Sequence, residues 1–251
     1  MFNLKFVLDY VQHRLEAKNR HGVHSPFVYR LIDEVIYDFR WKSDYSELEH
    51  LRQILQYDDR SILVYDQCTS VGVFVKNSCK SLRAAKLIYR LANYFSPNQV
   101  IEIGTSMGMD TTYLAKAAPQ ARIFSMDQGG DTTAITSENL VKQGIKNVQI
   151  LTGDLNQVVP DVLAELQSLD FVLINRGHDK KAMINYLNQC LPKFKETSLV
   201  VVDAIYLDKE MKGFWQQIKI HPQVTLTIDL FQIGLAFVRP QQAEEHFKIR
   251  F

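Results

Sequence analysis

The second half of the chain alternates short apolar runs with helical segments, and this alternation limits the folds open to it. After Pro97, five runs rich in Val, Ile, Leu or Phe each precede a polar turn: Gln99–Ile103, Arg122–Met126, Val148–Leu151, Asp170–Ile174 and Ser198–Val202. Strands separated by helices form βαβ units, which build parallel sheets. The sequence therefore predicts an α/β fold with five parallel strands.

The last two apolar runs break this rhythm. They read VTLTIDL and LAFVR, and only residues 231–234 separate them. A helical crossover needs a longer connection, so these runs predict an antiparallel hairpin. The expected sheet is mostly parallel, seven-stranded and closed by this hairpin.

The first third of the chain has a helical pattern, because apolar residues recur three or four positions apart, as at Phe2 and Phe6 or at Leu48 and Leu51. Ser25-Pro26 reads as an N-cap followed by proline at the first helical position. We therefore expect a helical N-terminal cap over residues 1–95 and an α/β domain over residues 96–251.

Composition excludes some partners. The 251 residues include 29 basic and 28 acidic side chains, a net charge of +1, so no global field attracts nucleic acid or a membrane surface. No signal-peptide pattern and no run of roughly 18 apolar residues is present, which predicts a cytoplasmic protein without membrane contact. The three cysteines, Cys68, Cys79 and Cys190, lack metal-binding spacing and are expected to be reduced core thiols.

The sharpest local motif follows the first predicted strand. The sequence VIEIGTSMG places Gly104 where the chain must turn and Gly108 where the free N–H groups of a helix start could approach a ligand. A dinucleotide fingerprint starting at Gly104 would need glycine at Ser106 and Met109, and the lysine of a phosphate-binding loop is absent. A plain strand-to-helix turn without a ligand remains open.

Acidic residues follow the next two predicted strands. Asp127 lies about two dozen residues after Gly104, where a carboxylate could accept hydrogen bonds from both hydroxyls of a ribose. Asp154 follows Gly153 and could accept a hydrogen bond from an adenine amino group. The alternatives are a loop cap for Asp127 and, for Asp154, an N-cap of the helix beginning near Leu155.

These motifs together resemble the class I S-adenosylmethionine-dependent methyltransferases, nearest the small-molecule O-methyltransferases related to catechol O-methyltransferase. The resemblance covers roughly residues 82 to 240 and rests on the glycine turn, Asp127, the LDFVLIN and VVVDAIY runs and the terminal hairpin. The segments HGVHSPFVY and DLFQIGLAFVRP also resemble a bacterial branch typical of Bacteroidetes. The resemblance implies the Rossmann-like methyltransferase fold.

The resemblance also implies a cofactor site for S-adenosylmethionine at the carboxyl ends of the strands, with S-adenosylhomocysteine as product. Its expected contacts come from the glycine turn, the acids that follow it and one amide: Glu102, Gly104, Thr105, Ser106, Gly108, Asp110, Asp127, Asp154 and Asn175. Glu102 and the turn would hold the methionine part, and Asp127 the ribose. Asp110 could pair with the ammonium group, or it could simply favour the helix macrodipole.

One departure from the family pattern concerns metal binding. In the catechol-type enzymes, magnesium is held by an aspartate after the fourth strand and an Asp-Asn pair after the fifth. The corresponding residues here are Asn175, Asp203 and Ala204. One carboxylate, one amide and one methyl group suit a hard cation poorly, so no tightly bound metal is expected.

Without a metal, a hydroxyl acceptor needs a protein base. His178 follows the fourth strand in the sequence NRGH, and a histidine titrates in the range suited to that role. Asp203 could orient this base or contact the acceptor. The structural alternatives are a loop histidine that hydrogen-bonds neighbouring backbone and an aspartate that caps a strand end.

The leading hypothesis is an enzyme that transfers a methyl group from S-adenosylmethionine to a small-molecule acceptor, with the helical cap covering the acceptor pocket. The acceptor atom would be a hydroxyl oxygen. One alternative is a non-catalytic S-adenosylmethionine-binding protein acting as a sensor or scaffold. A nicotinamide-dependent oxidoreductase is disfavoured by Ser106, Met109 and the terminal hairpin. The amphipathic N-terminal helices could also pair two copies into a homodimer.

Overall fold

The computed structural model describes residues 4–64, 66–175, 177 and 179–251. They form two compact units: residues 39–158, which we call the central unit, and residues 1–38 together with 159–251, which we call the terminal unit. The predicted cap is thus shared between the two units. The domain boundary after residue 95 stays a prediction.

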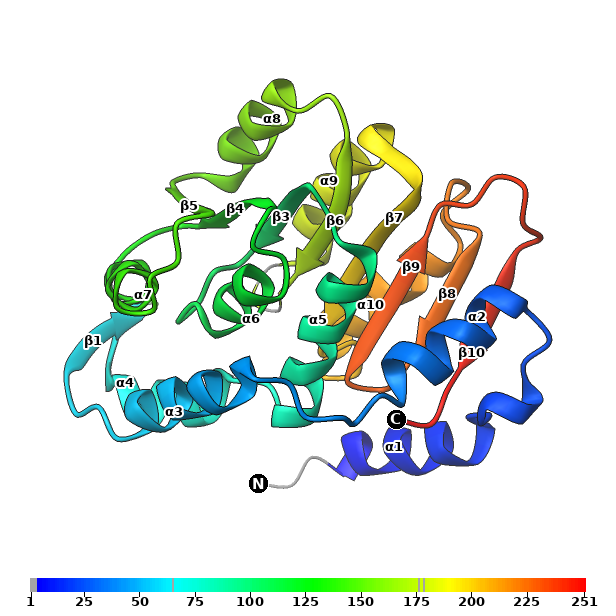
Figure 1. Cartoon of the computed structure of the whole chain (residues 1–251), viewed down its shortest axis with the longest axis horizontal. Helices are drawn as coiled ribbons and strands as arrows, with labels where there is room; N and C mark the ends of the chain where they lie inside the picture. The colour runs from blue at the N-terminus through cyan, green and yellow to red at the C-terminus, as the bar shows by residue number, and fades with distance from the viewer. Residues whose placement is uncertain (1–3, 65, 176, 178) are drawn as a thin grey trace. The chain divides into compact units, whose positions relative to one another are not determined.

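The central unit contains three parallel strands, a small hairpin and five helices among its described residues. Its elements are α3 (Asp44–Gln56), β1 (Ser61–Val64), β2 (Gln67–Ser70), α4 (Val71–Ser78), α5 (Leu82–Phe95), β3 (Gln99–Ile103), α6 (Met109–Ala117), β4 (Arg122–Asp127), α7 (Asp131–Lys142) and β5 (Val148–Thr152). Figure 1 shows β3, β4 and β5 side by side, and β4 pairs in parallel with both neighbours. The predicted βαβ arrangement is confirmed here.

The β1–β2 hairpin departs from the helical pattern expected over residues 1–95. Its strands pair antiparallel, from Ser61 opposite Ser70 to Val64 opposite Gln67. Each strand has only four residues, and only Ile62 among them is buried. Runs this short cannot be separated from a helical turn by apolar spacing, which explains why the sequence did not reveal them.

Among its described residues, the terminal unit contains five strands, whose order is β10-β8-β9-β7-β6. Its elements are α1 (Leu4–Glu16), η1 (Arg20–Gly22), α2 (Pro26–Leu31), the π-helical turn η2 (Ile32–Ile36), β6 (Leu169–Ile174), α9 (Lys180–Cys190), η3 (Leu191–Lys193), β7 (Phe194–Asp203), α10 (Lys209–Lys219), β8 (Leu226–Asp229), β9 (Ile233–Phe237) and β10 (Glu245–Lys248). Helix α8 (Leu155–Glu165) crosses from the central to the terminal unit.

The strand directions of the terminal unit confirm the predicted ending of the sheet. Strand β6 pairs in parallel with β7, whereas β9 pairs antiparallel with both β7 and β8. All seven strands predicted from the sequence are formed. Strand β10 is an additional one, parallel to β8. Its four residues are at most half-buried and carry no apolar alternation, so this strand could not be predicted from the sequence.

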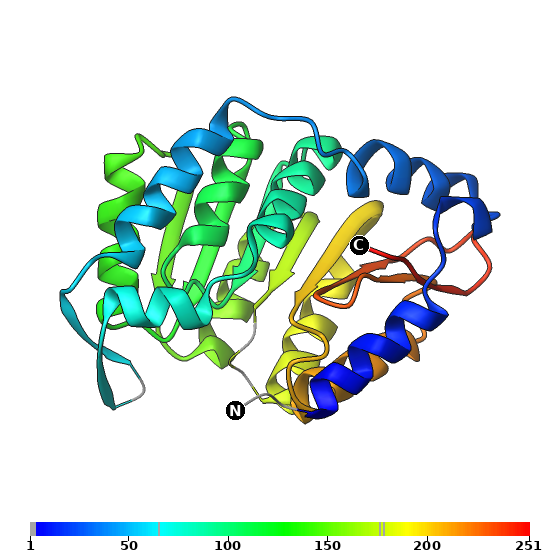
Figure 2. The same cartoon turned by 90° about the horizontal axis from the view of Figure 1, so that it is seen from below.

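Helix α1 belongs to the terminal unit and lies beside α10, as Figure 2 shows. Phe6 and Tyr10 each pack edge-on against Phe231, with ring centroids 5.1 Å apart. Asp9 forms an ion pair with Lys212 of α10. The N-terminal helix is therefore held by both aromatic packing and charge against the last third of the chain.

The cysteines differ in exposure. Cys190 is buried, as expected, and burial raises its pKa to about 12. Cys79 is half-buried and Cys68 is exposed, so the prediction of three core thiols is wrong for Cys68, which lies on the short hairpin. No helix within the described ranges is long and apolar enough to cross a membrane.

Candidate functional site

The glycine turn after β3 has an unusual backbone. Gly104, Ser106 and Gly108 all have positive φ angles, of 90°, 53° and 69°. The turn is fixed to the neighbouring strand, because the N–H of Gly104 donates to the carbonyl oxygen of Met126 over 2.8 Å. Positive φ is costly for a residue with a side chain, and such conformations cluster at functional sites.

Gly108 is required by packing against α7. A Cβ atom placed on Gly108 would lie 2.2 Å from Cγ2 of Thr136, so a larger residue would displace this helix. The Thr136 hydroxyl also donates to the carbonyl oxygen of Ser106 over 3.2 Å. The sequence predicted a close approach at Gly108, and the group that approaches it here is a threonine of the protein.

Asp127 closes the turn from the end of β4. Its Oδ2 accepts a hydrogen bond from the N–H of Ser106 at 2.9 Å, and its Oδ1 accepts one from the N–H of Gln128 at 2.8 Å. A carboxylate can accept about four hydrogen bonds, so these two leave capacity for hydroxyl donors. Asp127 is half-buried and can both hold the turn and face a ligand.

Glu102 lies beneath the turn and is fully buried. Its Oε2 accepts hydrogen bonds from the hydroxyls of Thr111 and Ser125, both at 2.6 Å, and Ser125 in turn contacts the hydroxyl of Thr105 at 2.7 Å. Burial, followed by the negative charge of Asp110, raises the pKa of Glu102 to about 8. Glu102 therefore anchors a buried polar network under the turn.

Asp110 has a protein partner that the sequence did not reveal. The Nζ of Lys80 lies 2.5 Å from Oδ2 of Asp110, and only 6% of the lysine side chain is exposed. Lys80 immediately precedes Ser81, the N-cap of α5, whose hydroxyl accepts from the N–H of Ala84. The carboxylate expected to pair with a cofactor ammonium is thus already neutralised by a buried cation.

Asp154 has the contacts of a helix cap. Its Oδ1 accepts from the backbone N–H of Asn156 at 2.9 Å and from the side-chain amide of the same residue at 3.0 Å. The residue is exposed and follows Gly153, whose φ is 146°. These contacts match the structural alternative stated above, an N-cap for α8.

In the terminal unit, Asn175 and Asp203 lie at the ends of neighbouring strands. Ile174 of β6 pairs with Val202 of β7, and the two polar residues follow one position later on each strand. Both are only 5% exposed. His178, the predicted base, lies outside the described residues, so its position relative to Asp203 stays a prediction.

Ala204 has a backbone conformation that suits another residue type better. Its φ is 52°, and its N–H donates to the carbonyl oxygen of Gln232 at 2.7 Å. Asparagine adopts this left-handed conformation several times more readily than alanine does. The backbone at position 204 would therefore suit asparagine, although the chain has alanine there.

The donor set after β6 and β7 does not fit magnesium. It offers the carboxylate of Asp203, the amide of Asn175 and the methyl group of Ala204, whereas Mg²⁺ is usually bound through carboxylates in a strict octahedral geometry. In the part of the chain that the structure describes, no group of three or more His, Cys, Asp or Glu side chains is placed to hold a metal ion.

Comparison with known proteins identifies the class to which this fold and turn belong. Residues 101–205, which include the turn, Asp127, Asn175 and Asp203, match the family model of a methyltransferase domain. The resemblance predicted from the sequence is confirmed by this match, and the Rossmann-like fold is confirmed by the similarity to solved methyltransferase structures.

The individual relatives are O-methyltransferases. The chain is 23% identical to catechol O-methyltransferase of Niastella koreensis over 168 residues, which are 65% of this chain and 75% of the relative. It is 26% identical to catechol O-methyltransferase of Mycobacterium tuberculosis over 127 residues, 50% of this chain and 56% of that one. The fold matches O-methyltransferase TomG of Streptomyces achromogenes, solved with S-adenosylmethionine, with a TM-score of 0.58 and 17% identity over 88% of this chain and 99% of that chain. The non-catalytic alternative is not favoured by these matches.

Proposed function

We propose that this chain is an S-adenosylmethionine-dependent methyltransferase that methylates a hydroxyl oxygen of a small molecule without a metal ion. The observation that carries the proposal is the closed turn in which the Asp127 carboxylate accepts from the Ser106 N–H beside three residues of positive φ. A turn of this kind leaves backbone groups and one carboxylate at the carboxyl ends of β3 and β4.

The residues of the turn fit the cofactor by the chemistry of their groups. Asp127 offers acceptor capacity for ribose hydroxyls, and the backbone from Gly104 to Gly108 would hold the methionine part. Bound S-adenosylmethionine would supply an electrophilic methyl group on a sulfonium centre. Glu102 and Lys80 would act through other residues: Glu102 supports the turn from below, and Lys80 fixes the carboxylate of Asp110.

In a reaction without a metal ion, side chains must accept the proton of the hydroxyl group and orient the acceptor. A hydroxyl becomes a useful nucleophile when a neighbouring base accepts its proton, and we assign this role to His178. Asp203, buried at the end of β7, would orient the base or the acceptor. The single carboxylate after β6 and β7 supports a reaction without magnesium, in contrast to the catechol-type pattern.

The test is release of S-adenosylhomocysteine in the presence of a panel of phenols and catechols, with either EDTA or magnesium. We expect turnover that EDTA does not abolish. Turnover that requires magnesium would contradict the metal-independent mechanism, and inactivity with every acceptor would weigh against an enzyme of this substrate class.

Two histidine substitutions, made in separate variants, test the proposed base. His178→Ala should lower kcat by about 100-fold or more while cofactor affinity is unchanged, since general base catalysis contributes about 10²–10⁴. His50→Ala is the matched control, because His50 is an exposed histidine of α3. Equal kcat in the two variants would remove His178 from the mechanism.

The assembly and location of the enzyme are also proposals. A net charge of +1 supports a cytoplasmic protein that acts on small molecules and binds neither nucleic acid nor membranes. Helix α1 exposes a row of apolar side chains at helical spacing, Leu4, Leu8, Val11 and Leu15, which supports a homodimer. Light scattering of the full chain, compared with Leu8→Glu, would test it: a dimer that the substitution dissociates is expected.

A further inference from the structure

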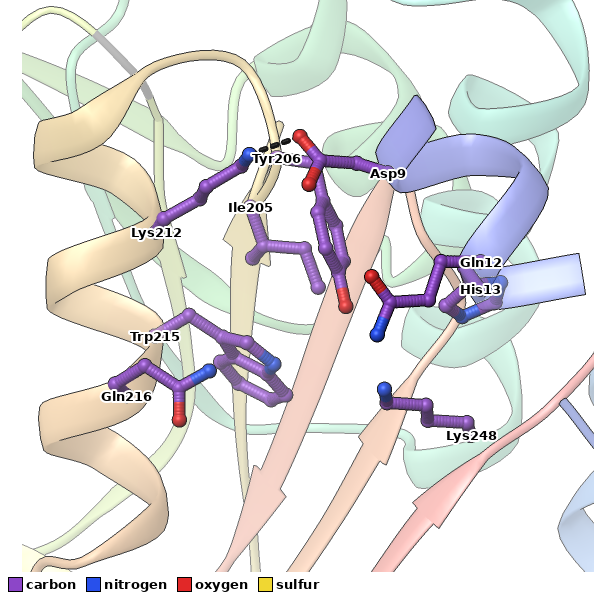
Figure 3. Close-up of a pocket in the computed structure, with 9 residues that line it drawn as sticks. All are labelled: Asp9, Gln12, His13, Ile205, Tyr206, Lys212, Trp215, Gln216 and Lys248. Carbon is purple, nitrogen blue, oxygen red and sulfur yellow. Dashed lines mark hydrogen bonds and ion pairs between the residues drawn. The ribbon is translucent and has the colours of Figure 1, made fainter. Parts of the chain in front are cut away.

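The terminal unit contains a pocket that none of the residues assigned above lines. Its volume is about 230 Å³. Figure 3 shows its lining, which comes from α1, the segment after β7, α10 and β10: Asp9, Gln12, His13, Ile205, Tyr206, Lys212, Trp215, Gln216 and Lys248. Pockets for drug-sized ligands occupy roughly 300–1,000 Å³, so this one suits a smaller molecule.

The indole of Trp215 supplies a donor without a partner. Trp215 is 1% exposed, and among the described residues no acceptor lies within hydrogen-bonding distance of its Nε1. In Figure 3 the nitrogen-bearing edge of the ring faces the side of the pocket that holds Gln12 and Lys248. A buried donor left unpaired costs about 1–3 kcal/mol, and an acceptor oxygen from a ligand would remove this cost.

The ring cannot turn away to satisfy that donor elsewhere. A Cβ atom placed on Gly234 of β9 would lie 2.6 Å from the indole, so the ring fits tightly over this glycine. The Nζ of Lys219 lies 5.5 Å from the ring centroid. Packing therefore fixes the orientation of the donor.

Two further donors stand at the same pocket with hydrogens to spare. The ammonium group of Lys248 pairs with Glu16, and the amide nitrogen of Gln12 donates to Glu16 over 2.8 Å. An ammonium group has three N–H donors and an amide nitrogen has two, so each retains at least one. Together with Trp215, they provide a cation and two neutral donors for one anionic group.

The opposite wall is aromatic and fixed in place. Tyr206 stacks on Phe231 with ring centroids 4.8 Å apart, and its hydroxyl donates to Oδ2 of the buried Asp229 at 2.8 Å. His13 also contacts Asp229, with Nε2 3.0 Å from Oδ1. Because these partners hold Tyr206, its half-buried ring offers a preformed apolar surface to a flat ligand.

We infer that this pocket binds a small aromatic carboxylate, whose carboxylate accepts hydrogen bonds from Trp215, Lys248 and Gln12 and whose ring packs against Tyr206. The fixed donor edge of Trp215 faces the cation, and the apolar wall is aromatic. The inference does not depend on methyl transfer, because it uses none of the residues assigned to the cofactor or acceptor.

The experiment titrates the full chain with benzoate and, as a neutral ligand of the same shape, benzamide. The chain has two tryptophans, Trp41 and Trp215, so Trp41→Phe leaves Trp215 as the single indole fluorophore. In this background benzoate should change the Trp215 emission, and its affinity should exceed that of benzamide by at least about fivefold, because only benzoate pairs its charge with Lys248.

Two substitutions locate the ligand, with calorimetry as the measurement. Trp215→Phe should weaken benzoate binding by about tenfold or more, since it removes a hydrogen bond to a charged group. Lys248→Met should weaken it by about fivefold, as expected for a partly exposed ion pair. Trp41→Phe is the matched control and should bind benzoate like the wild type, because Trp41 is 59% exposed and lies in the central unit.

Three results would overturn the inference: no binding of benzoate at millimolar concentration, benzamide binding as tightly as benzoate, or unchanged affinity in both pocket variants. If thermal unfolding shows that Trp215→Phe does not fold, Lys248→Met decides, because that side chain is 31% exposed and its removal leaves the core intact. A parallel titration with S-adenosylmethionine reports on the proposed function separately.

Discussion

The turn after β3 and the loops after β6 and β7 have kept different parts of the methyltransferase pattern. At the turn, side chains and backbone agree: Asp127 closes the loop and Glu102 supports it from a buried network. After β7, the backbone of Ala204 keeps a left-handed conformation although its side chain cannot bind a metal. The turn proposed to bind the cofactor is therefore fully formed, whereas the residues after β6 and β7 do not offer the oxygen ligands that magnesium prefers.

This difference shows that a loop can have a suitable backbone conformation without the side chains that a metal site needs. The left-handed backbone at Ala204 is supported by the hydrogen bond from its N–H to the carbonyl oxygen of Gln232, which does not involve the side chain. A magnesium site, by contrast, depends on the oxygen ligands themselves. The turn is therefore fully formed in a chain whose residue 204 has no side-chain group that could bind a metal.

The largest expected effect concerns the turn itself. Gly104→Val should lower the affinity for S-adenosylmethionine by at least about 100-fold, because a branched side chain at a φ of 90° strains the turn and fills the space proposed for the ligand. Calorimetry measures it. Gly144→Val is the matched control, since Gly144 also has a positive φ, of 64°, with open space around its Cβ position. Equal affinities of the two variants for S-adenosylmethionine would contradict the location of the cofactor site at this turn.

Two buried carboxylates should give opposite responses to pH. The pKa of Glu102 is raised from 4.5 to about 8, so its protonated form favours the folded state and this stability is lost as pH rises from about 4.5 through 8. Glu102→Gln should flatten the free energy of unfolding over this range, by about 3 kcal/mol at pH 8 relative to pH 5. Urea unfolding at a series of pH values measures it.

Asp229 is the matched control for that experiment. Burial alone would raise its pKa, but hydrogen bonds from His13, the Phe231 N–H and Tyr206 hold the pKa of this carboxyl below its usual value. Its contribution to stability is therefore present above about pH 4 and is lost at lower pH. Asp229→Asn should lower the free energy of unfolding above about pH 4 and flatten its fall at lower pH, and an unchanged pH dependence below pH 4 would contradict the assignment.

The acids after β4 and β5 should differ in cofactor binding. Asp127→Asn should weaken S-adenosylmethionine binding by about tenfold, because the amide keeps an acceptor for Ser106 but loses the charged acceptor for the ribose. Asp154→Asn should change affinity by less than about threefold, since Asp154 is occupied with capping α8. A larger effect at Asp154 than at Asp127 would reverse the two roles.

The smallest expected effect is a gain of metal binding. Asn175→Asp combined with Ala204→Asn would restore two oxygen ligands beside Asp203, at the ends of paired strands whose backbone already suits asparagine at position 204. We expect magnesium affinity to rise by about tenfold, measured by calorimetry. Asn175→Asp with Ala204→Gly, which lacks the second ligand, is the control. If both double variants bind magnesium alike, residue 204 has no part in the site.

Much of this organisation could be predicted from the sequence because it depends on local patterns. The five parallel strands and the final hairpin have apolar runs and connection lengths that specify them, and Gly104 and Asp127 lie at fixed distances within a βαβ unit. The shortest strands could not be predicted: strand β10 and the β1–β2 hairpin have four-residue strands with little buried apolar surface.

Contacts between distant parts of the chain could not be predicted. Lys80 reaches Asp110 across thirty positions, and nothing in the sequence around Ser81 indicates a cation aimed at the turn. The pocket beside Trp215 unites residues from Asp9 to Lys248, and its unpaired indole donor is a property of packing alone. The role of Asp154 could not be predicted either, because the sequence allowed both a helix cap and a ligand contact.

The most direct test of the account is a calorimetric titration of the wild-type chain with S-adenosylmethionine, S-adenosylhomocysteine and NAD. The structure of the turn predicts saturable binding of both adenosyl compounds and none of NAD. Saturation by NAD, with no heat from either adenosyl compound at millimolar concentration, would contradict the assignment of the turn and with it the proposed function.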